Sequence, residues 1–317
     1  MKGKIIYVGL VVITVILILL LSVITPGLVH AEDVDTEVSD YIVRDPIRIN
    51  DNSDFAAQAT AEGWPGDGSE FDPYVIEGYE IDGTGYGYGI YVGNTTVHFV
   101  VRGCYVHNAS GVDQGGNGGP IPNPHLNTGI ILISVPNSII ENNTLINNVN
   151  RGIYLAESGD TEIIDNMVLS NDEGIRLSYS NNNVLKNNII CDNVFGISLA
   201  HSVENTIIHN KIYHEKGSSG SGINLQHSDN NFINNNTISN YRIGIWGINS
   251  FDNVVEDNTF MEIVWVNILF EEVVNGRIPD SENYFEYLDL IYIAAFSIAV
   301  AIIVITLIIW KRKDKQK

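Results

Sequence analysis

The chain has few cysteines, methionines and basic residues, and these shortages exclude several classes of protein. Two cysteines in 317 residues cannot form a disulfide framework. Seventeen Lys and Arg against 38 Asp and Glu give a net charge of −21, which excludes a nucleic-acid binder that works by neutralising phosphates. A hydrophobic content of 44% excludes a disordered chain. The sequence instead contains 36 Asn and 29 Gly, residues that favour tight turns over helices.

Both ends of the chain have the pattern of membrane-associated segments. After Lys2 and Lys4, residues 5–23 carry no charge. We expect residues 1–31 to be a secretory signal peptide or, because the apolar stretch is long, an uncleaved N-terminal anchor. Residues 290–310 form a second apolar stretch, long enough to cross a hydrocarbon core of about 30 Å as a transmembrane helix. Five of the residues 311–317 are basic, which predicts a cytoplasmic tail.

These ends predict a protein of the cell membrane with a single C-terminal anchor and with its middle outside the cytoplasm. Residues 32–286 contain 36 acidic and 10 basic residues, so the acidic excess lies in that outer part. It favours solubility and could attract cations or basic partners, but it does not define a site. Four glycosylation sequons fit an exported chain, at Asn94, Asn108, Asn142 and Asn235.

The middle of the chain is a repeat with a period of 22 residues. A glycine followed by two mostly apolar residues recurs at spacings of 23, 22, 22, 26 and 22 residues. An Asn series has the same five spacings. A Ser series from Ser158 to Ser250 has the last four of these spacings. All three contain the same four-residue insertion, near residues 217–220. The glycines are Gly129, Gly152, Gly174, Gly196, Gly222 and Gly244, and the Asn residues are Asn143, Asn166, Asn188, Asn210, Asn236 and Asn258.

This period predicts an all-β fold, a parallel β-helix. Each repeat contains three short stretches in which apolar and polar residues alternate, separated by turns, as in strands. Repeats of helical pairs need more than about 30 residues, and the leucine-rich repeat needs a consensus that is absent here. We expect about eight coils over residues 74–270, with equivalent side chains stacked about 4.8 Å apart. The predicted inner columns are Ile130, Ile153, Ile175, Ile197, Ile223 and Ile245, and Leu145, Val168, Ile190, Ile212, Ile238 and Phe260.

The repeat divides the chain into segments. Residues 32–73 are expected to be an N-terminal segment and cap, with a leading strand at 46–49 and a helix at 53–62 that ends at Gly63. Residues 271–289 would then be a juxtamembrane linker, 290–310 the transmembrane helix and 311–317 the basic tail. Cys104 takes the Asn position of an earlier coil, and Cys191 lies three coils further on, so both are expected to be free thiols.

The pattern Asn-x-Ile-x-x-Asn-x-Ile, followed by Gly-Ile-x-Leu-x-x-Ser, resembles the right-handed parallel β-helix repeat of the NosD family. The opening residues 66–76 are similar to the entry segment of archaeal surface proteins with this domain. The resemblance covers about residues 45–270. It implies a right-handed β-helix and, because that family is named for an accessory protein of copper-site maturation, a possible role in handling copper. The same repeat occurs in enzymes and in binding modules, so it implies the fold more than an activity.

An outward column two residues past the repeat glycine is the candidate carbohydrate site. It contains Tyr154, Arg176, Ser198, Asn224 and Trp246. Aromatic rings stack on the apolar faces of sugars, and guanidinium and amide groups bind hydroxyls, so we expect Tyr154, Arg176, Asn224 and Trp246 to bind a sugar polymer. The alternative interpretation is ordinary decoration of an exposed sheet by residues that favour strands.

Five residues past the glycine, His201 and His227 fall in adjacent coils and could share copper or another divalent cation. Two ligands are fewer than a tight site needs, so these could equally be solvated turn residues.

For a hydrolase, two carboxylates should lie within about 5–10 Å. Asp165 and Asp257 share a column four coils apart, and Glu173 is expected to pair with Arg151 instead. The long loop at 108–128 is either a functional insertion or an exposed tip.

The sequence therefore favours a membrane-anchored surface protein whose β-helix binds carbohydrate or neighbouring surface proteins without catalysis and without a required cofactor. A copper accessory protein of the NosD type is the first alternative, and a polysaccharide lyase or hydrolase is the second. Nucleic acid is not expected as a partner.

Overall fold

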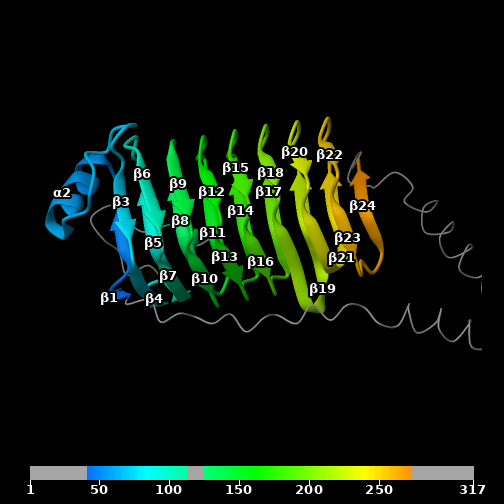
Figure 1. Cartoon of the computed structure of the whole chain (residues 1–317), viewed down its shortest axis with the longest axis horizontal. Helices are drawn as coiled ribbons and strands as arrows, with labels where there is room; N and C mark the ends of the chain where they lie inside the picture. The colour runs from blue at the N-terminus through cyan, green and yellow to red at the C-terminus, as the bar shows by residue number, and fades with distance from the viewer. Residues whose placement is uncertain (1–40, 113–120, 122–124, 273–317) are drawn as a thin grey trace, which may run out of the picture. The chain divides into compact units, whose positions relative to one another are not determined.

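The computed structural model of the chain describes residues 41–112, 121 and 125–272, in which parallel strands form successive coils (Figure 1). One sheet has eight strands, one from each coil, and its order follows the sequence with a spacing of one coil. These strands are β3 (Tyr74–Glu77), β6 (Phe99–Arg102), β9 (Ser138–Glu141), β12 (Glu162–Ile164), β15 (Val184–Lys186), β18 (Thr206–Ile208), β20 (Phe232–Asn234) and β22 (Val254–Glu256).

The other two strands of each coil belong to a single 16-stranded sheet, because β19 (Lys211–Gln226) and β21 (Thr237–Ile248) continue around a corner of the coil. Its first face contains β1 (Ile42–Arg44), β4 (Tyr79–Gly85), β7 (Tyr105–Gly111), β10 (Thr144–Ile146), β13 (Met167–Leu169), β16 (Ile189–Cys191) and β23 (Thr259–Met261). Its second face, the β11 face, contains β2 (Ile47–Ile49), β5 (Tyr88–Gly93), β8 (Thr128–Ile133), β11 (Arg151–Ala156), β14 (Glu173–Ser178), β17 (Phe195–Ala200), the second halves of β19 and β21, and β24 (Val266–Glu271).

The prediction of a parallel β-helix of about eight coils is confirmed. Ile153, Ile175 and Ile197 are register partners in consecutive strands, and all three side chains are fully buried. The second predicted column is likewise in register, from Leu145 through Val168 and Ile190 onward. The repeat glycine has a steric cause, since a Cβ at Gly196 would overlap the carbonyl oxygen of Gly222 and the side chain of Ile212. Burial of these aliphatic columns stabilises the fold by roughly 1.5–3 kcal/mol per side chain.

The predicted Asn column forms a continuous hydrogen-bond ladder inside the coil. Asn188 Nδ2 donates to Asn210 Oδ1 at 2.9 Å and to the carbonyl of Ile163 at 2.8 Å, and Asn166 repeats the pattern one coil earlier. Cys104 occupies this column in the earlier coil, where its N–H donates to Asn143 Oδ1. The structure adds two ladders that the sequence analysis did not identify. One contains Asn148, Asn171 and Asn193, and the other Asn183, Asn205, Asn231 and Asn253.

The left-handed backbone conformation of these corners lies one residue before the ladder Asn. The ladder residues have no positive φ, whereas the residues that precede them do, such as Asn142 (φ 52°), Asn187 (φ 57°) and Asn235 (φ 53°). Asn serves two purposes in each Asn-Asn pair. The first, exposed amide tolerates the left-handed corner, and the second, buried amide joins the ladder.

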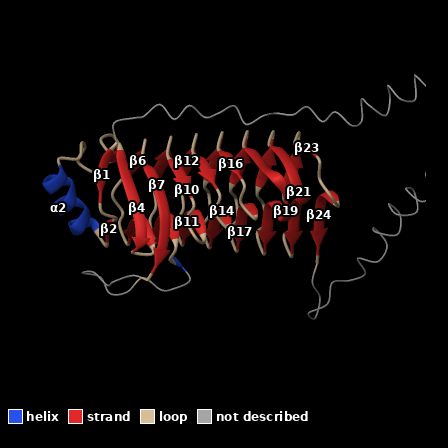
Figure 2. Cartoon of the chain, turned by 90° about the horizontal axis from the view of Figure 1, so that it is seen from below, coloured by secondary structure: helices blue, strands red, loops and turns tan. Residues whose placement is uncertain are grey.

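The first coil is closed by a helix, as predicted. Helix α2 (Asn52–Glu62) begins at the N-cap Asp51, which accepts from the N–H of Asp54, and ends at the left-handed Gly63. Figures 1 and 2 show it across the end of the stack, and β2 pairs with β5 as the predicted leading strand. Phe55 is buried with its ring centroid 5.0 Å from that of Tyr74, so α2 covers the otherwise open core.

The predicted signal or anchor at 1–31 and the predicted transmembrane helix at 290–310 lie outside the described residues. Within the described ranges, no helix has both the length and the apolar character needed to cross a bilayer.

Candidate functional site

The residues of the predicted outer column stand side by side on the β11 face. Tyr154 pairs with Arg176, Arg176 with Ser198, Ser198 with Asn224, and Asn224 with Trp246. Because the strands are parallel and in register, these side chains follow one another at steps of about 4.8 Å. A second outer column, which the sequence analysis did not consider, lies one residue before each repeat glycine. It contains Arg151, Glu173, Phe195, Ser221 and Ile243.

Three polar side chains in the middle of these two columns are buried without a hydrogen-bond partner. Ser198 Oγ, Ser221 Oγ and Asn224 Oδ1 have none in the described part of the chain. Asn224 is the register partner of Ser198, and Ser221 lies on the same strand as Asn224. An unpaired buried polar group costs about 1–3 kcal/mol, so three on neighbouring strands contrast with the Asn ladders, whose buried amides are paired. Ser221 could have been found from the sequence as the residue before Gly222.

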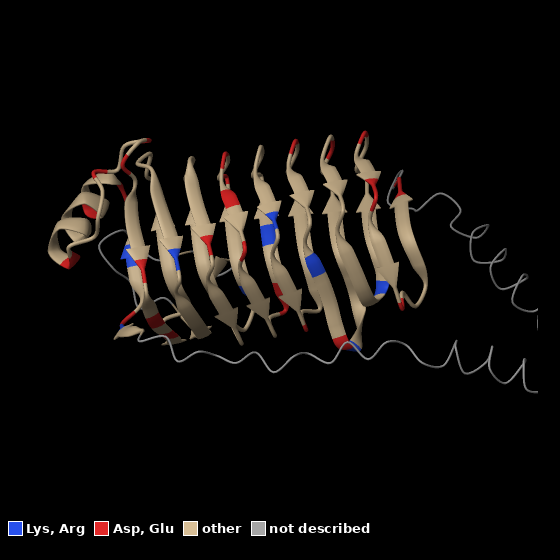
Figure 3. Ribbon diagram, viewed as in Figure 1, with Lys and Arg blue, Asp and Glu red and all other residues tan. Residues whose placement is uncertain are grey.

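An ion network lies on one side of this polar centre. Glu173 accepts from Arg151 Nε at 2.7 Å and from Arg176 Nη1 at 2.8 Å, and all three side chains are partly buried. The predicted Arg151–Glu173 pair is confirmed, and Arg176 is its unforeseen third member. Two guanidinium groups on one carboxylate leave a local charge of about +1 on the β11 face. In Figure 3, Asp and Glu residues lie at many of the turns between strands.

Tyr154 lies under side chains from the end of the long loop. Its ring stacks on His125 at 5.3 Å between centroids and lies 4.7 Å from the Arg151 guanidinium carbon. Ile121, Leu126 and Ile131 complete a small hydrophobic cluster around it, so only 6% of Tyr154 is exposed. Burial, followed by the charge of Arg151, lowers the pKa of His125. Residues 113–120 and 122–124 of this predicted functional loop lie outside the described residues.

Trp246 lies on the other side of the polar centre, and Leu269 of β24 follows it in register. Trp246 is partly buried, and its Nε1 donates to Glu271 Oε2 at 3.2 Å on β24. The structure therefore places Arg176, Asn224 and Trp246 in one column with the unpaired polar atoms. Asn224 and Tyr154 are 4% and 6% exposed, so in this column the partly exposed side chains are those of Arg176 and Trp246.

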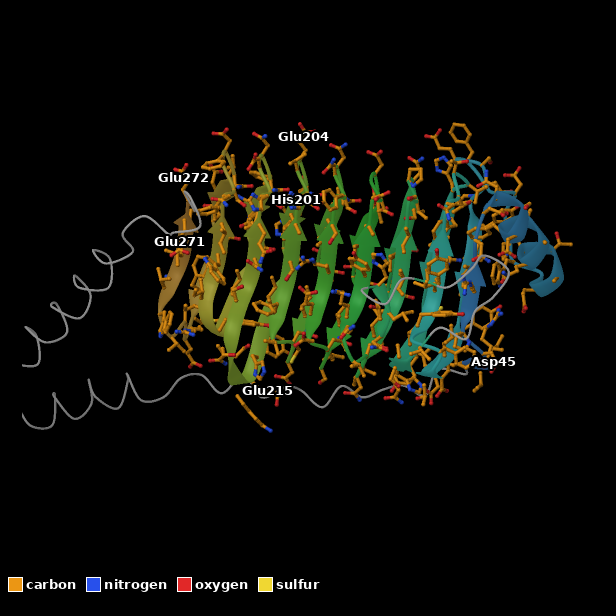
Figure 4. The ribbon with its side chains drawn as sticks, turned by 180° about the vertical axis from the view of Figure 1, so that it is seen from behind. Asp45, His201, Glu204, Glu215, Glu271 and Glu272 are labelled. Carbon is orange, nitrogen blue, oxygen red and sulfur yellow. The ribbon has the colours of Figure 1, made fainter. Side chains whose placement is uncertain are left out.

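The predicted metal residues form an exposed stack of rings. The ring centroids of His201 and His227 are 4.9 Å apart with 2° between the planes, and Tyr179 stacks on His201 at 4.8 Å. All three occupy left-handed corners in consecutive coils, and Figure 4 shows the position of His201. Ring nitrogens bind metals in the plane of the ring, so one of these parallel rings would have to rotate before both held the same ion. The described residues contain no group of three or more His, Cys, Asp or Glu suited to a metal.

Two further sets of predicted residues are accounted for by the geometry. Asp165 and Asp257 are exposed corner residues on β-helix coils that are four apart. Cys104 and Cys191 are free and buried, and burial raises the pKa of these thiols to about 11 and about 12. Neither is a reactive thiolate near neutral pH.

The four sequon residues lie at different positions of the coil but share one conformation. Each is exposed and has a left-handed backbone. They are Asn94, Asn108, Asn142 and Asn235.

Comparisons with known proteins give distant structural similarities and one family match. No curated protein matches the sequence. A periplasmic alginate epimerase, AlgG, has 19% identity and a TM-score of 0.45, over 61% of this chain and 50% of its own. The surface adhesin PfbA of Streptococcus pneumoniae has 13% identity and a TM-score of 0.44, over 75% and 63%. The tailspike protein 2 of bacteriophage CBA120 has 12% identity and a TM-score of 0.42, over 62% and 34%. The chain thus spans about half the length of the epimerase, and likenesses at this level do not bear on activity.

A family model agrees with the repeat. Residues 84–216 match the model described as "Periplasmic copper-binding protein (NosD)". This range begins in β4 and ends in β19, and its described residues lie within the stacked coils. The chain is therefore a parallel β-helix in which residues 84–216, less than half of its length, are similar to the NosD family.

Proposed function

We propose that this chain is a non-enzymatic binding module of the cell surface, and that it binds carbohydrate across the outer column of the β11 face, from Arg176 to Trp246. The proposal rests on one observation. Ser198, Ser221 and Asn224 hold buried polar atoms without partners in the middle of this column. These three side chains are at most 4% exposed, so a ligand would have to displace the side chains that cover them. Its hydroxyl groups would then supply the missing hydrogen bonds, and the binding free energy would offset a cost that the free protein carries.

The groups on either side suit a polymer of sugars. The indole of Trp246 has an apolar face for stacking on a pyranose ring. Arg176 is only partly neutralised, because its partner Glu173 also pairs with Arg151, so its guanidinium can still attract an anionic group. Coils separated by about 4.8 Å would present one polar side chain to each successive sugar unit. The local positive charge in an acidic domain favours a ligand that carries carboxylates or hydroxyls over a basic one.

In this proposal the apolar ends of the chain hold the domain at a membrane, outside the cytoplasm, as the sequence patterns of residues 1–31 and 290–310 suggest. The four exposed sequons carry glycans. Neighbouring surface proteins are the alternative partners for the same face.

Asn224→Leu provides a test in which binding and stability change in different directions. Leucine has nearly the volume of asparagine and removes an unpaired polar atom, so the free energy of unfolding should stay unchanged or rise. Binding to the best ligand from a panel of neutral and uronate-containing oligosaccharides should weaken about tenfold or more, because the hydrogen bonds of the ligand are lost. Calorimetric titration and thermal unfolding measure the two effects.

Trp246→Ala should weaken the same binding by a similar factor, and Thr206→Ala is the matched control because Thr206 lies on the eight-stranded sheet. Unchanged binding in both Asn224→Leu and Trp246→Ala, with a carbohydrate that the unmodified protein does bind, would refute the site. Release of new reducing or unsaturated ends during the titration would instead indicate a hydrolase or lyase.

A second function is favoured by the description of the matched family, which is that of a copper-binding protein. In that case, His201 and His227 would hold the copper ion as cargo after rotation of one ring. Titration with Cu(I) or Cu(II) should then saturate near one equivalent, and His201→Ala/His227→Ala should abolish it. His209→Ala is the control, because His209 is an exposed corner residue in the next turn. Equal binding in all three proteins would exclude the pair as the copper site.

A further inference from the structure

The charged side chains of the β11 face are gathered in one place. Strands β8, β11, β14 and β17 and the second halves of β19 and β21 contain three charged residues, namely Arg151, Glu173 and Arg176. Two positive charges and one negative give this trio a charge of +1, in a chain whose net charge is −21. Arg176 is also the register partner of Ser198, so the positive charge lies directly beside the unpaired polar atoms of the outer column.

The geometry of the trio leaves guanidinium donors available to a ligand. Glu173 Oε2 accepts from Arg151 Nε at 2.7 Å, and its Oε1 accepts from Arg176 Nη1 at 2.8 Å. Arg176 Nε donates to Ser178 Oγ at 3.4 Å, and its Nη2 donates to no group in the described part of the chain. The planar donors of a guanidinium match the two oxygens of a carboxylate. Because the Arg176 side chain is 19% exposed, an acidic group of a ligand can reach these donors.

The positions around the trio are uncharged. In the neighbouring strands, Thr128 is the register partner of Arg151, and Phe195 is that of Glu173. Glu157 and Asp172, which lie directly after β11 and directly before β14, are exposed in turns, where water and salt screen their charges. The charge that a ligand meets on this part of the face is therefore that of the trio.

This positive charge does not depend on the histidine beside it. His125 stacks on Tyr154, whose ring lies 4.7 Å from the Arg151 guanidinium carbon. Burial and the charge of Arg151 lower the pKa of His125, so its ring is neutral near neutral pH. The two guanidinium groups alone supply the positive charge.

These contacts deepen the proposed carbohydrate site, and the inference rests on that proposal. We propose that the ligand is an acidic polysaccharide, that Arg176 binds the carboxylate of one uronate unit, and that Glu173 determines this specificity. Glu173 holds both guanidinium groups at the outer column and cancels one of their two charges, so the site balances a single carboxylate. Neighbouring units of the polymer would follow the column toward Asn224 and Trp246.

Calorimetric titration of the full chain with matched ligand pairs tests this inference. The probes are hexamers of galacturonate, mannuronate and glucuronate, each compared with the same hexamer after reduction of its carboxyl groups to alcohols. The unmodified protein should bind a uronate hexamer about tenfold or more tightly than the reduced form, because reduction removes a charge-assisted hydrogen bond. Arg176→Gln should abolish this ratio. Arg176→Lys keeps the charge without the planar donors and should abolish part of it.

Glu173→Gln distinguishes a charge effect from damage to the fold. The substitution raises the charge of the trio from +1 to +2, so the ratio should increase about threefold or more, whereas a damaged site would bind both forms less tightly. Arg102→Gln is the control, because it removes a positive charge from the eight-stranded sheet, where Arg102 pairs with Glu77. The ratio of the control should equal that of the unmodified protein.

Equal affinity for the uronate and reduced forms, or a ratio that Arg176→Gln leaves unchanged, would overturn the inference. If the reduced form binds and Trp246→Ala weakens its binding, the carbohydrate site stands and only its acidic specificity fails. If no hexamer binds in either form, both proposals fail. Tighter binding of a sulfated hexamer, with the same dependence on Arg176, would assign the site to sulfate instead of carboxylate.

Discussion

Ile197→Asp is expected to prevent the β-helix from folding. Ile197 is fully buried between its register partners Ile175 and Ile223, where no water and no cation can compensate a carboxylate. Burial of an unpaired charge, together with the loss of an aliphatic side chain, costs more than about 5 kcal/mol, which is comparable to the entire stability of a typical domain. Circular dichroism and urea unfolding of the purified variant measure the effect.

The control places the same change on the outside of a coil. Ile208 is partly exposed on β18, beside Lys186 and Asn234, so Ile208→Asp can be solvated and can pair with the ammonium group. The variant should fold, and its free energy of unfolding should fall by no more than about 1 kcal/mol. If Ile197→Asp folds as well as Ile208→Asp does, the stacked aliphatic column is not what stabilises this domain.

Asn188→Ala is expected to lower the free energy of unfolding by about 3–5 kcal/mol, far more than the removal of one amide usually does. The Asn188 side chain accepts from the N–H and the Nδ2 of Asn166, and donates to the carbonyl of Ile163 and to Asn210 Oδ1. The substitution leaves several of these buried groups unpaired at once. Urea unfolding of the variant, compared with the unmodified protein, gives the difference in the free energy of unfolding.

Asn187→Ala, one residue earlier, separates the ladder from the turn. Asn187 is exposed with φ 57°, so alanine there bears only the strain of the left-handed backbone, about 1 kcal/mol. Equal losses in Asn187→Ala and Asn188→Ala would mean that the ladder adds nothing beyond the conformation of the corner.

The repeat made most of this fold predictable. Gly196 and Asn188 recur with one shared period, and a parallel coil places each copy against the next, so the spacing alone predicts which residues stack. The helix that covers Phe55 was also predictable, because its cap and its terminal glycine are local signals.

What failed was the prediction of residues whose surroundings do not repeat. The spacing could not decide whether the left-handed corner is the ladder Asn or the residue before it, because both choices fit the same period. The burial of Tyr154 under His125 was missed, since it depends on a unique loop that returns to the sheet. Arg176, the second guanidinium of the network, was predicted only as a member of the outer column, although it shares Glu173 with Arg151.

The sequence by itself determined the parallel coils, the aliphatic columns and the internal Asn ladder, because a period of 22 residues is a direct statement of which side chains meet in adjacent coils. Only the tertiary structure decided which outward side chains are left with unsatisfied polar atoms and which are covered. These properties depend on packing between segments that occur once in the chain. Such contacts do not recur with the period of the repeat, so the spacing of residues cannot predict them.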